Sequence, residues 1–560
     1  MQQNSLADVE SIVGYDRSAA HANFLVFIPA LTLFCLGALS DIRVPGVYMD
    51  AVNPDYMVVR LLYPNAHFQP WILPGALVLG LFPLLVQVYH GALPFYVGLP
   101  VYALLGTGVI GIRVANMVFG LLVIFAAGAF MRAFQVRASI AALCLAALAL
   151  DPGFLFSFRT QFYILLLPSA ALFTSVALTE RRRRMPTWGT AATAGLLAGL
   201  ACYGYFIYLF AVPSVAAHAW LRWRERAERY RLAAWWIAGF ALAMAPYPAS
   251  MLLTLVATGG LHGFVGFWTA YLHTLAANKS QLTMMSRINF FFNSVRRTVL
   301  DTGPSIMMLH KPLPLSVPTL KMWLLLGVPG IGLVVSLIRA PRFSGLVVLG
   351  AFVLGEAVLF GVFGDRLWLQ HLVVLLPILY IAFALTLENA AIRLALRRSL
   401  VVDIAACVVM TPLVVGNVVD SQAMLQALRE TGGVGFASDA LTHFADDSLL
   451  NRPSATDAFF PDWGIFMSFV MITHGQIATT TSFSPDEARR ALCNGHDVLL
   501  ALMANQDPER LPAWISAIDR GQPSIATYRQ HDGTPVLIAI RWHASTQSQA
   551  LPSDHPCQHP

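Results

Sequence analysis

Long apolar stretches recur along the first 420 residues and alternate with short polar segments. An apolar helix of about 20 residues crosses the ~30 Å hydrocarbon core of a bilayer. Eleven stretches are predicted to be such helices, near residues 22–40, 109–131, 138–152, 161–179, 189–206, 207–221, 232–255, 319–338, 343–363, 368–387 and 400–417. The pattern therefore predicts a polytopic α-helical membrane protein with about 11 transmembrane helices.

The loops between these stretches differ in charge, and the difference predicts a topology. Cytoplasmic loops of membrane proteins are enriched in Lys and Arg. With the N-terminus (1–21) inside, every predicted inner loop is basic: 132–137, 181–184, 222–231, 339–342 and 393–398. The outer segments are longer and less basic per residue: 41–108, 256–318 and the tail from 420. An odd number of spans places that tail outside.

Composition supports the membrane class and excludes others. Hydrophobic residues make up 57% and charged residues 12% of the 560 positions, which is unlike a soluble globular protein. Residues 1–419 hold 28 basic and 15 acidic residues, whereas 420–560 hold 8 and 15. The basic residues cluster in short loops between spans, so no nucleic-acid partner is expected.

Two outer loops need an interpretation beyond their polarity. The run 71–89 is apolar enough to resemble a span, yet counting it would place the later arginine runs outside. Prolines at 74 and 83 interrupt it, so an interfacial or re-entrant segment is predicted. The loop 256–318 mixes aromatic and basic residues and predicts amphipathic segments on the outer surface. A solvated basic loop is the alternative.

The tail has the composition and length of a small soluble domain. Residues 497–504 resemble a buried strand, 508–518 an amphipathic helix and 524–542 a hairpin that turns at Asp532-Gly533. We expect an α/β domain over 420–545, which lies outside in the periplasm, and a disordered end at 546–560. Trp463 either fills its core or faces a ligand together with Asp462. The domain's acidic balance predicts that it faces away from the membrane or contacts the 256–318 loop.

Carboxylates in the first outer loop are the first candidates for chemistry. Asp50 and Asp55 flank the turn signal Asn53-Pro54, which can start a short helix at Tyr56. Both would lie at the membrane surface, close to headgroups and within reach of water. Because Asp is a preferred N-cap, the structural alternative is that they cap a turn and an interfacial helix.

Further polar residues fall on the same predicted side of the membrane. They occur in three segments: YHGALPFYVGLP (89–100) leading to Arg113, the hairpin DPGFLFSFRTQFY (151–163), and GDRLWLQHL (364–372). Arginines there can also snorkel to lipid phosphates, and single histidines often pack in a core. Their gathering on one side favours a functional site.

These residues resemble the integral-membrane glycosyltransferases of the GT-C fold, including the protein O-mannosyltransferases and lipid A aminoarabinose transferases. In that superfamily the catalytic carboxylate follows the first span, a position that Asp50 in GVYMDAVNPDY matches. YHGALPFY with GTGVIGIRVANMVFG is similar to the superfamily's His-Pro-Pro-Leu-Tyr stretch and the glycine and arginine after it. The prolines after His90 are missing. Gln161 stands near the place of a second acid. The resemblance covers about residues 20–400.

The resemblance implies inverting transfer of a sugar from a polyprenyl-phosphate donor to a periplasmic protein, lipid or glycan acceptor. Asp50 would be the base, because partial desolvation raises a carboxyl pKa towards a useful value. Asp55 would contact a metal or the acceptor, or cap the helix. The leaving phosphate needs cations, for which the candidates are Arg113, Arg159, Arg366, Arg296 and Arg297, or else a divalent metal such as Mg²⁺ or Mn²⁺. The candidate cavity residues are Tyr56, His90, Gln161, Tyr163 and His371.

Two other functions fit a polytopic membrane protein of this kind. A transporter or lipid flippase is the main alternative, although Glu356 and Asp403 are the only acidic residues predicted inside spans once Asp151 is counted with the hairpin 151–163. A scaffold whose outer domain binds a partner is the other. For the enzyme, the resemblance implies a multi-pass protein of the bacterial inner membrane with residues 22–419 as its transmembrane core.

Overall fold

The computed structural model of the chain describes most of its residues. The described ranges are 27–183, 185–277, 282–339, 344–364, 367–394, 400–451, 455–462, 464–505, 509–518 and 522–544. Predictions for Arg366, Trp463 and the last residues after 544 therefore lie outside them.

A helical bundle forms at the places where the sequence predicts spans. Its helices are α2 (Ile28–Leu39), α5 (Val109–Ala133), α6 (Ala138–Leu150), α8 (Tyr163–Arg181), α9 (Trp188–Gly204), α10 (Val212–Trp223), α11 (Arg229–Met244), α12 (Pro246–Ala257), α16 (Pro318–Met322), the π-helical turn η5 (Trp323–Gly327), α17 (Val328–Arg339), α18 (Gly345–Phe363), α19 (Leu375–Arg393) and α20 (Leu400–Thr431). Within the described ranges, 7 helices are long and apolar enough to cross a membrane, or up to 8 if one bent pair counts as a single span. The protein is a polytopic membrane protein, and the count of eleven stays a prediction.

The bundle is packed closely where glycines face a neighbouring helix. A Cβ atom on Gly195 of α9 would lie 1.9 Å from the carbonyl oxygen of Trp236 in α11, and one on Gly239 would lie 2.0 Å from that of Ala192. No side chain fits there, so the two backbones touch directly. Such contacts through small residues are a usual means of helix association in membranes, where lipid provides no hydrophobic driving force.

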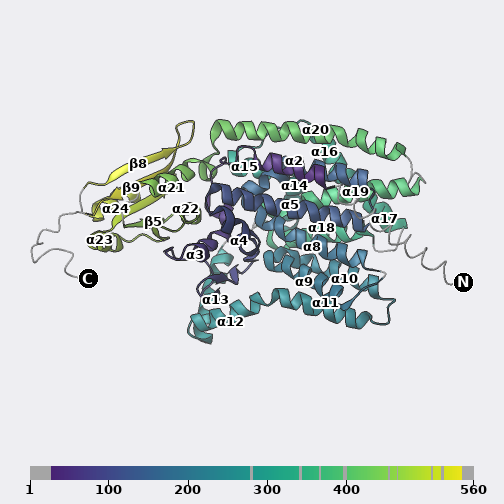
Figure 1. Cartoon of the computed structure of the whole chain (residues 1–560), viewed down its shortest axis with the longest axis horizontal. Helices are drawn as coiled ribbons and strands as arrows, with labels where there is room; N and C mark the ends of the chain where they lie inside the picture. The colour runs from purple at the N-terminus through teal and green to yellow at the C-terminus, as the bar shows by residue number, and fades with distance from the viewer. Residues whose placement is uncertain are drawn as a thin grey trace, which may run out of the picture.

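The basic loops meet at one end of the bundle. Arg137 forms ion pairs with Glu388 (3.1 Å) and Asp403 (3.4 Å), which joins the α5–α6 loop to the ends of α19 and α20. Glu180 at the end of α8 pairs with Arg183 (2.7 Å) and with Arg222 of α10 (2.6 Å). The first outer loop and the C-terminal domain lie at the other end of the bundle (Figure 1).

The predicted boundary between membrane core and tail at 419/420 falls inside a helix. α20 continues without a break to Thr431, and its 32 residues make it ~48 Å long, which exceeds the ~30 Å hydrocarbon core. It runs along one side of the bundle to the C-terminal domain (Figure 1). Asp420, just past the predicted boundary, accepts hydrogen bonds from the backbone and hydroxyl of Ser316 at 2.7 and 2.6 Å.

The first outer loop folds into short elements that lead from α2 to α5. They are η1 (Met49–Val52), η2 (Asp55–Met57), α3 (Val58–Leu62), the hairpins β1/β2 (Leu77–Val78, Phe82–Pro83) and β3/β4 (Leu85–Gln87, His90–Gly91), and α4 (Leu93–Leu105). The helix predicted near Tyr56 is present. The apolar run 71–89 forms hairpins and no spanning helix, as its prolines predict.

The second long outer loop contains helices. They are α13 (Leu261–Ala277), α14 (Met284–Val299) and α15 (Thr302–Leu309). Arg296 and Arg297 lie in the last turn of α14 and are exposed, whereas Phe291 on the same helix is buried. α14 is therefore amphipathic, in line with one of the two alternatives for this loop.

The tail folds into a sheet with helices on both faces. Its elements are α21 (Ala440–Leu450), β5 (Thr456–Phe459), α22 (Phe466–Ile472), β6 (Ala478–Thr480), α23 (Pro485–Cys493), β7 (Asp497–Met503), α24 (Arg510–Ile518), β8 (Ser524–Arg529) and β9 (Pro535–Trp542). The strand order is β6-β5-β7-β9-β8, with β6, β5 and β7 parallel. Alternate residues of β7 face α21 and α22 on one side and α23 and α24 on the other. The predicted strand, helix and hairpin coincide with β7, α24 and β8–β9.

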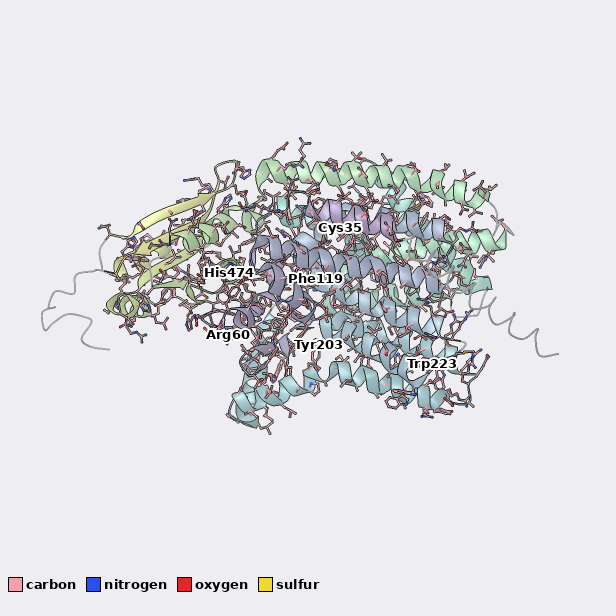
Figure 2. The ribbon with its side chains drawn as sticks, in the orientation of Figure 1. Cys35, Arg60, Phe119, Tyr203, Trp223 and His474 are labelled. Carbon is pink, nitrogen blue, oxygen red and sulfur yellow. The ribbon has the colours of Figure 1, made fainter. Side chains whose placement is uncertain are left out.

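The C-terminal domain is docked on the first outer loop. The backbone N–H of Gly46 donates to Ala437 (2.8 Å) and that of Met49 to Gly464 (3.0 Å). A Cβ on Gly46 would lie 2.0 Å from the carbonyl oxygen of Ser438, so glycine permits this approach. Figure 2 shows His474 at the same junction. The segment that precedes the domain contacts the 256–318 loop, where Val434 N–H donates to Met308 (2.8 Å) and Ser316 donates to Asp420.

The charge asymmetry gives a direct test of topology. A reporter that is active only in the cytoplasm should stay silent when it is fused after residue 545 and should be active when it is inserted at 222–231. The reason is that basic loops are retained inside. Strong activity of the fusion after 545 would contradict the topology and the outer location of the candidate site.

Candidate active site

Asp50 is presented by a short helical turn that is fixed on both sides. The turn η1 starts after the buried Tyr48, and its first N–H, that of Met49, is bound to Gly464 of the C-terminal domain. The Asp50 side chain is partly exposed, and the described residues provide no hydrogen bond to its carboxylate. Partial burial of the carboxyl group removes water from it and raises the pKa of Asp50 to about 6. It is a desolvated carboxylate that water or a ligand can still reach.

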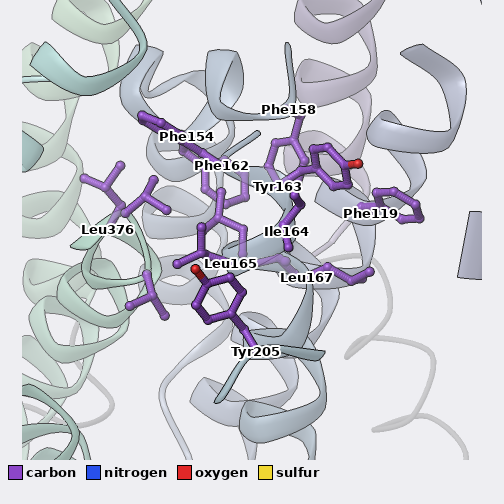
Figure 3. Packing of buried hydrophobic residues seen from close by; sticks show 14 of the residues in the cluster. Phe119, Phe154, Phe158, Phe162, Tyr163, Ile164, Leu165, Leu167, Tyr205 and Leu376 are labelled. Atoms are coloured by element: carbon purple, nitrogen blue, oxygen red, sulfur yellow. The ribbon is translucent and has the colours of Figure 1, made fainter. Parts of the chain in front are cut away.

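Asp55 has a different environment, although it is only five residues away. Its side chain is completely buried and accepts hydrogen bonds from the hydroxyls of Tyr102 (2.9 Å) and Tyr163. It does not cap the helix that follows, and its predicted contact with a metal or the acceptor stays a prediction. Burial raises the pKa of Asp55 to about 6 in spite of both hydrogen bonds. The ring of Tyr163 stacks on that of Phe119, with centroids 5.5 Å apart (Figure 3).

Tyr205 brings the two predicted histidines together. The ring of His90 stacks on Tyr205, with centroids 6.0 Å apart and an angle of 10° between the planes. The Tyr205 hydroxyl lies 3.2 Å from Nε2 of His371. Burial lowers the pKa of His90 to about 4, so its imidazole is neutral at neutral pH and provides no cation for a phosphate. Tyr89 also packs against Tyr205, with ring centroids 5.8 Å apart. Burial raises the pKa of Tyr89 to about 12, and Tyr271 and the negative charge of Asp50 add to this increase.

Gln161 connects three outer segments. The Tyr48 hydroxyl donates to Oε1 of Gln161 (3.1 Å) and accepts from its backbone N–H (3.1 Å). The Gln161 amide donates in turn to Gln370. Tyr56 holds another part of the first outer loop, since its hydroxyl oxygen accepts a hydrogen bond from the backbone N–H of Trp71 (2.6 Å). The predicted cavity residues are thus close to the loop that carries Asp50, and several of them hold it in place.

Arg113 and Arg159 bind the backbone of the first outer loop. Arg113 donates to the carbonyl oxygens of Pro45 (2.5 Å) and Arg159 (3.2 Å). Arg159 lies at the end of the turn η3 (Phe156–Arg159), and both arginines are buried. Its guanidinium donates to carbonyl oxygens of five residues: Gly37, Ala38, Ser40, Asp41 and Val44. Both arginines thus hold the backbone of the first outer loop, and the phosphate binding predicted for them stays a prediction.

The arrangement can be compared with known proteins. No protein-family model and no curated protein matches the sequence. Among solved structures, ArnT from Cupriavidus metallidurans bound to undecaprenyl phosphate superposes with a TM-score of 0.59 at 13% identity, covering 92% of this chain and 97% of that one. The apo state of the same enzyme gives 0.56 at 12% identity, covering 93% and 98%. The protein has the GT-C fold.

In the GT-C fold of this chain the candidate residues are distributed unevenly. Asp50, His90, Gln161 and His371 lie around the first outer loop, as described above. Arg296 and Arg297 are exposed at the end of α14, whose body packs against the turn η7 (Leu369–Leu372) that holds His371. The described residues contain no group of three or more His, Cys, Asp or Glu side chains that could hold a metal ion. A role for Mg²⁺ or Mn²⁺ stays a prediction.

One buried charged cluster was missed by the sequence analysis. Lys321 of α16 forms ion pairs with Asp151 (2.7 Å) and Asp301 (2.5 Å), and Tyr380 donates to Asp151 (2.8 Å). All of these side chains are buried. The available signal was a lysine inside the apolar segment TLKMWLLLGV, because an ionisable residue in such a segment usually has a charged partner.

The two tyrosine hydroxyls that donate to Asp55 predict how its replacement changes the stability of the protein. Asp55→Ala leaves the hydroxyls of Tyr102 and Tyr163 buried without an acceptor, at a cost of ~1–3 kcal/mol each in the free energy of unfolding. Thermal unfolding of the purified protein should therefore show a clear decrease in Tm. Asp50→Ala is the matched control and should change Tm little, since no hydrogen bond is lost. Equal decreases for both variants would contradict the structural role of Asp55.

Proposed function

We propose that the protein is a glycosyltransferase that moves a sugar from a polyprenyl-phosphate donor to an acceptor outside the membrane, with Asp50 as the base. The observation that carries this proposal is the partly exposed Asp50 carboxylate, without a hydrogen-bond partner among the described residues, in the first outer loop of a GT-C fold. Asp55 is fully engaged by two tyrosines and is given a structural role.

The reaction is an inverting displacement at the anomeric carbon. Asp50 accepts the proton of the acceptor hydroxyl or amine while the acceptor atom forms a bond to the anomeric carbon. The bond between that carbon and the donor phosphate oxygen breaks, and its electron pair leaves with the polyprenyl phosphate. A pKa near 6 keeps Asp50 ionised at neutral pH while it remains basic enough for general base catalysis.

An apolar groove between η4 (Phe206–Phe210), α10 and α18 suits the polyprenyl chain. It has a volume of about 470 Å³ and is lined by Leu209 and Phe210 of η4, by Pro213 of α10 and by Leu354 and Val358 of α18. η4 begins directly after Tyr205, the residue that joins the two histidines. ArnT has been solved with undecaprenyl phosphate, and we infer a donor lipid of the same class here.

The leaving phosphate requires positive charge in the proposed mechanism. Arg113 and Arg159 already donate to backbone carbonyls, so we assign this role first to Arg296 and Arg297, which are exposed at the end of α14. Arg366 lies outside the described residues and stays a candidate. Arginine suits a phosphate, because its planar group can form two parallel hydrogen bonds.

The proposed location follows from the donor. Nucleotide sugars are cytoplasmic, whereas Asp50 lies at the end of the bundle opposite the basic loops. A sugar already carried across on a lipid phosphate meets this requirement. We therefore place the protein in the bacterial inner membrane, with the C-terminal domain in the periplasm. The transporter or flippase alternative is not favoured, since Asp403 is paired with Arg137 at the basic end.

Loss of the base should abolish transfer without loss of the protein. In cells that lack the gene, wild-type protein should restore a surface glycan or glycoconjugate that mass analysis detects, whereas Asp50→Asn should reduce its formation about 10²–10⁴-fold. Asp486→Asn, an exposed carboxylate on α23, is the matched control and should restore it fully. Near-normal product with Asp50→Asn at equal expression would show that another residue is the base.

The raised pKa of Asp50 predicts the pH dependence of transfer. Only the ionised carboxylate can accept a proton, so kcat/KM should increase about tenfold per pH unit below pH about 6 and level off above it. A radiolabelled lipid-linked donor and purified protein in lipid nanodiscs would measure it. A profile that is flat from pH about 4 to about 8 would argue against Asp50 as the base.

A further inference from the structure

A pocket opens between the first outer loop and the C-terminal domain. Its volume of about 440 Å³ falls in the ~300–1,000 Å³ range of small-molecule sites. One wall comes from the loop, through Met49, Gln69 and Trp71. The other comes from the domain, through Phe460, Asp462 and Thr481.

The position of the pocket in the sheet is one at which α/β domains bind ligands. Phe460 and Asp462 follow β5, and Thr481 follows β6, so the pocket lies at the carboxyl ends of two neighbouring parallel strands. The chain leaves β5 through α22 to reach β6 on one side and then returns through α23 to β7 on the other. Ligands of open α/β sheets bind outside the carboxyl ends of the strands. The change of direction itself lies between β5 and β7, so the pocket lies beside it, on the β6 side of β5.

The loop wall of the pocket is held in place by the domain itself. His67 N–H donates to Gly475 (3.2 Å), and Thr479 N–H donates to the carbonyl of His67 (3.1 Å), so the loop extends the sheet beyond β6. Further along the loop, the Trp71 N–H is bound to the Tyr56 hydroxyl (2.6 Å). The pocket is therefore largely formed before any ligand binds, which lowers the entropic cost of binding.

The pocket adjoins the residue that we propose as the base. Met49, which lines it, directly precedes Asp50 in η1, and the N–H of Met49 is bound to Gly464 of the domain. A group seated in the pocket thus lies beside the turn that presents the Asp50 carboxylate. In a transferase this is a place for the acceptor, since the polyprenyl groove lies on the α10–α18 side.

The chemistry of the lining indicates the kind of acceptor. Gln69, Asp462 and Thr481 provide an amide, a carboxylate and a hydroxyl, which suit the hydroxyl groups of a sugar. The Asp462 carboxylate also accepts from the Met503 N–H (2.9 Å). Trp71 is 45% exposed and offers a flat apolar surface for the C–H face of a sugar ring. No Lys, Arg or His is among the described residues of the lining, and the nearby Arg60 donates to the carbonyl of Phe68 (2.7 Å). An anionic ligand would therefore lie beside the Asp462 carboxylate.

We propose that this pocket is the acceptor subsite and that it binds an uncharged saccharide. The inference rests on the proposed glycosyltransferase function and deepens it, because it names the acceptor class. The aromatic side chain of Trp71 stacks on the sugar ring, and Asp462, Gln69 and Thr481 bind its hydroxyls. A hydroxyl of the saccharide then reaches Asp50 for deprotonation.

Binding can be tested without turnover. The full-length protein in lipid nanodiscs is titrated with methyl glycosides of a hexose, a pentose and an N-acetylhexosamine, and with inorganic phosphate and glucose 1-phosphate as anionic probes. Ligand-observed saturation-transfer NMR reports binding. At least one neutral glycoside should give a signal, and the anionic probes should not compete with it. Absence of a signal from every glycoside, or competition by phosphate, would overturn the proposal.

Variants connect the signal to the pocket. Trp71→Ala and Thr481→Val should each reduce glycoside affinity at least fivefold. The matched controls, Trp188→Ala on an exposed tryptophan of α9 and Thr411→Val on an exposed threonine of α20, should leave affinity unchanged. Far-UV circular dichroism and Tm identify a variant that fails to fold, and Gln69→Ala then serves as the third lining variant. Affinity that survives all folded lining variants would place the saccharide elsewhere.

The outcome separates this inference from the proposed function. In one outcome, glycosides bind with an affinity that the lining variants reduce, while cells with Asp50→Asn keep their glycans. In that case the saccharide site is confirmed and the assignment of Asp50 as the base is wrong. If Asp50→Asn abolishes transfer while no glycoside binds the pocket, the transferase stands and the acceptor class proposed here is wrong.

Discussion

Two buried guanidinium groups hold the segment on which the candidate site is built. Arg113 and Arg159 reach from different helical segments to carbonyl oxygens between Gly37 and Pro45. A buried charge is costly unless polar groups surround it, and the row of carbonyl dipoles meets that requirement. The same bonds fix the chain as it leaves α2. Asp50 follows five residues after Pro45, so its position depends on these two side chains.

The other half of the constraint comes from the C-terminal domain. The N–H groups of Gly46 and Met49 donate to backbone carbonyls of that domain, and Val47 N–H donates to the Thr442 hydroxyl (3.2 Å). The turn that carries Asp50 is therefore held between arginines of the membrane core and the backbone of the domain. The domain thus completes the loop from which Asp50 projects.

The sequence predicts the elements better than it predicts their contacts. Apolar length and loop charge locate the helices, and Pro74 and Pro83 exclude a span at 71–89. Arginine at positions 113 and 159 could equally have snorkelled to phosphates, because composition does not show which oxygen a guanidinium binds. The difference between Asp50 and Asp55 depends on Tyr102 and Tyr163, which lie far away in the sequence. The docking of Gly46 on Ser438 connects segments almost 400 residues apart, and no local pattern indicates it.

The arginine contacts themselves depend on a deeper ion cluster. Asp151 accepts from the N–H of Phe154 and so starts the short helix α7 (Pro152–Leu155) that leads into η3 and Arg159. Lys321 and Tyr380 fix the other oxygen of Asp151 at 2.7 and 2.8 Å. Lys321 also pairs with Asp301, and burial, with the charge of Asp151, raises the pKa of Asp301 well above its usual value. One lysine thus forms ion pairs with two buried carboxylates. Buried polar groups are usually hydrogen-bonded, and in this protein such bonds fix α16 to Asp151 and Arg159 to the segment that precedes Asp50.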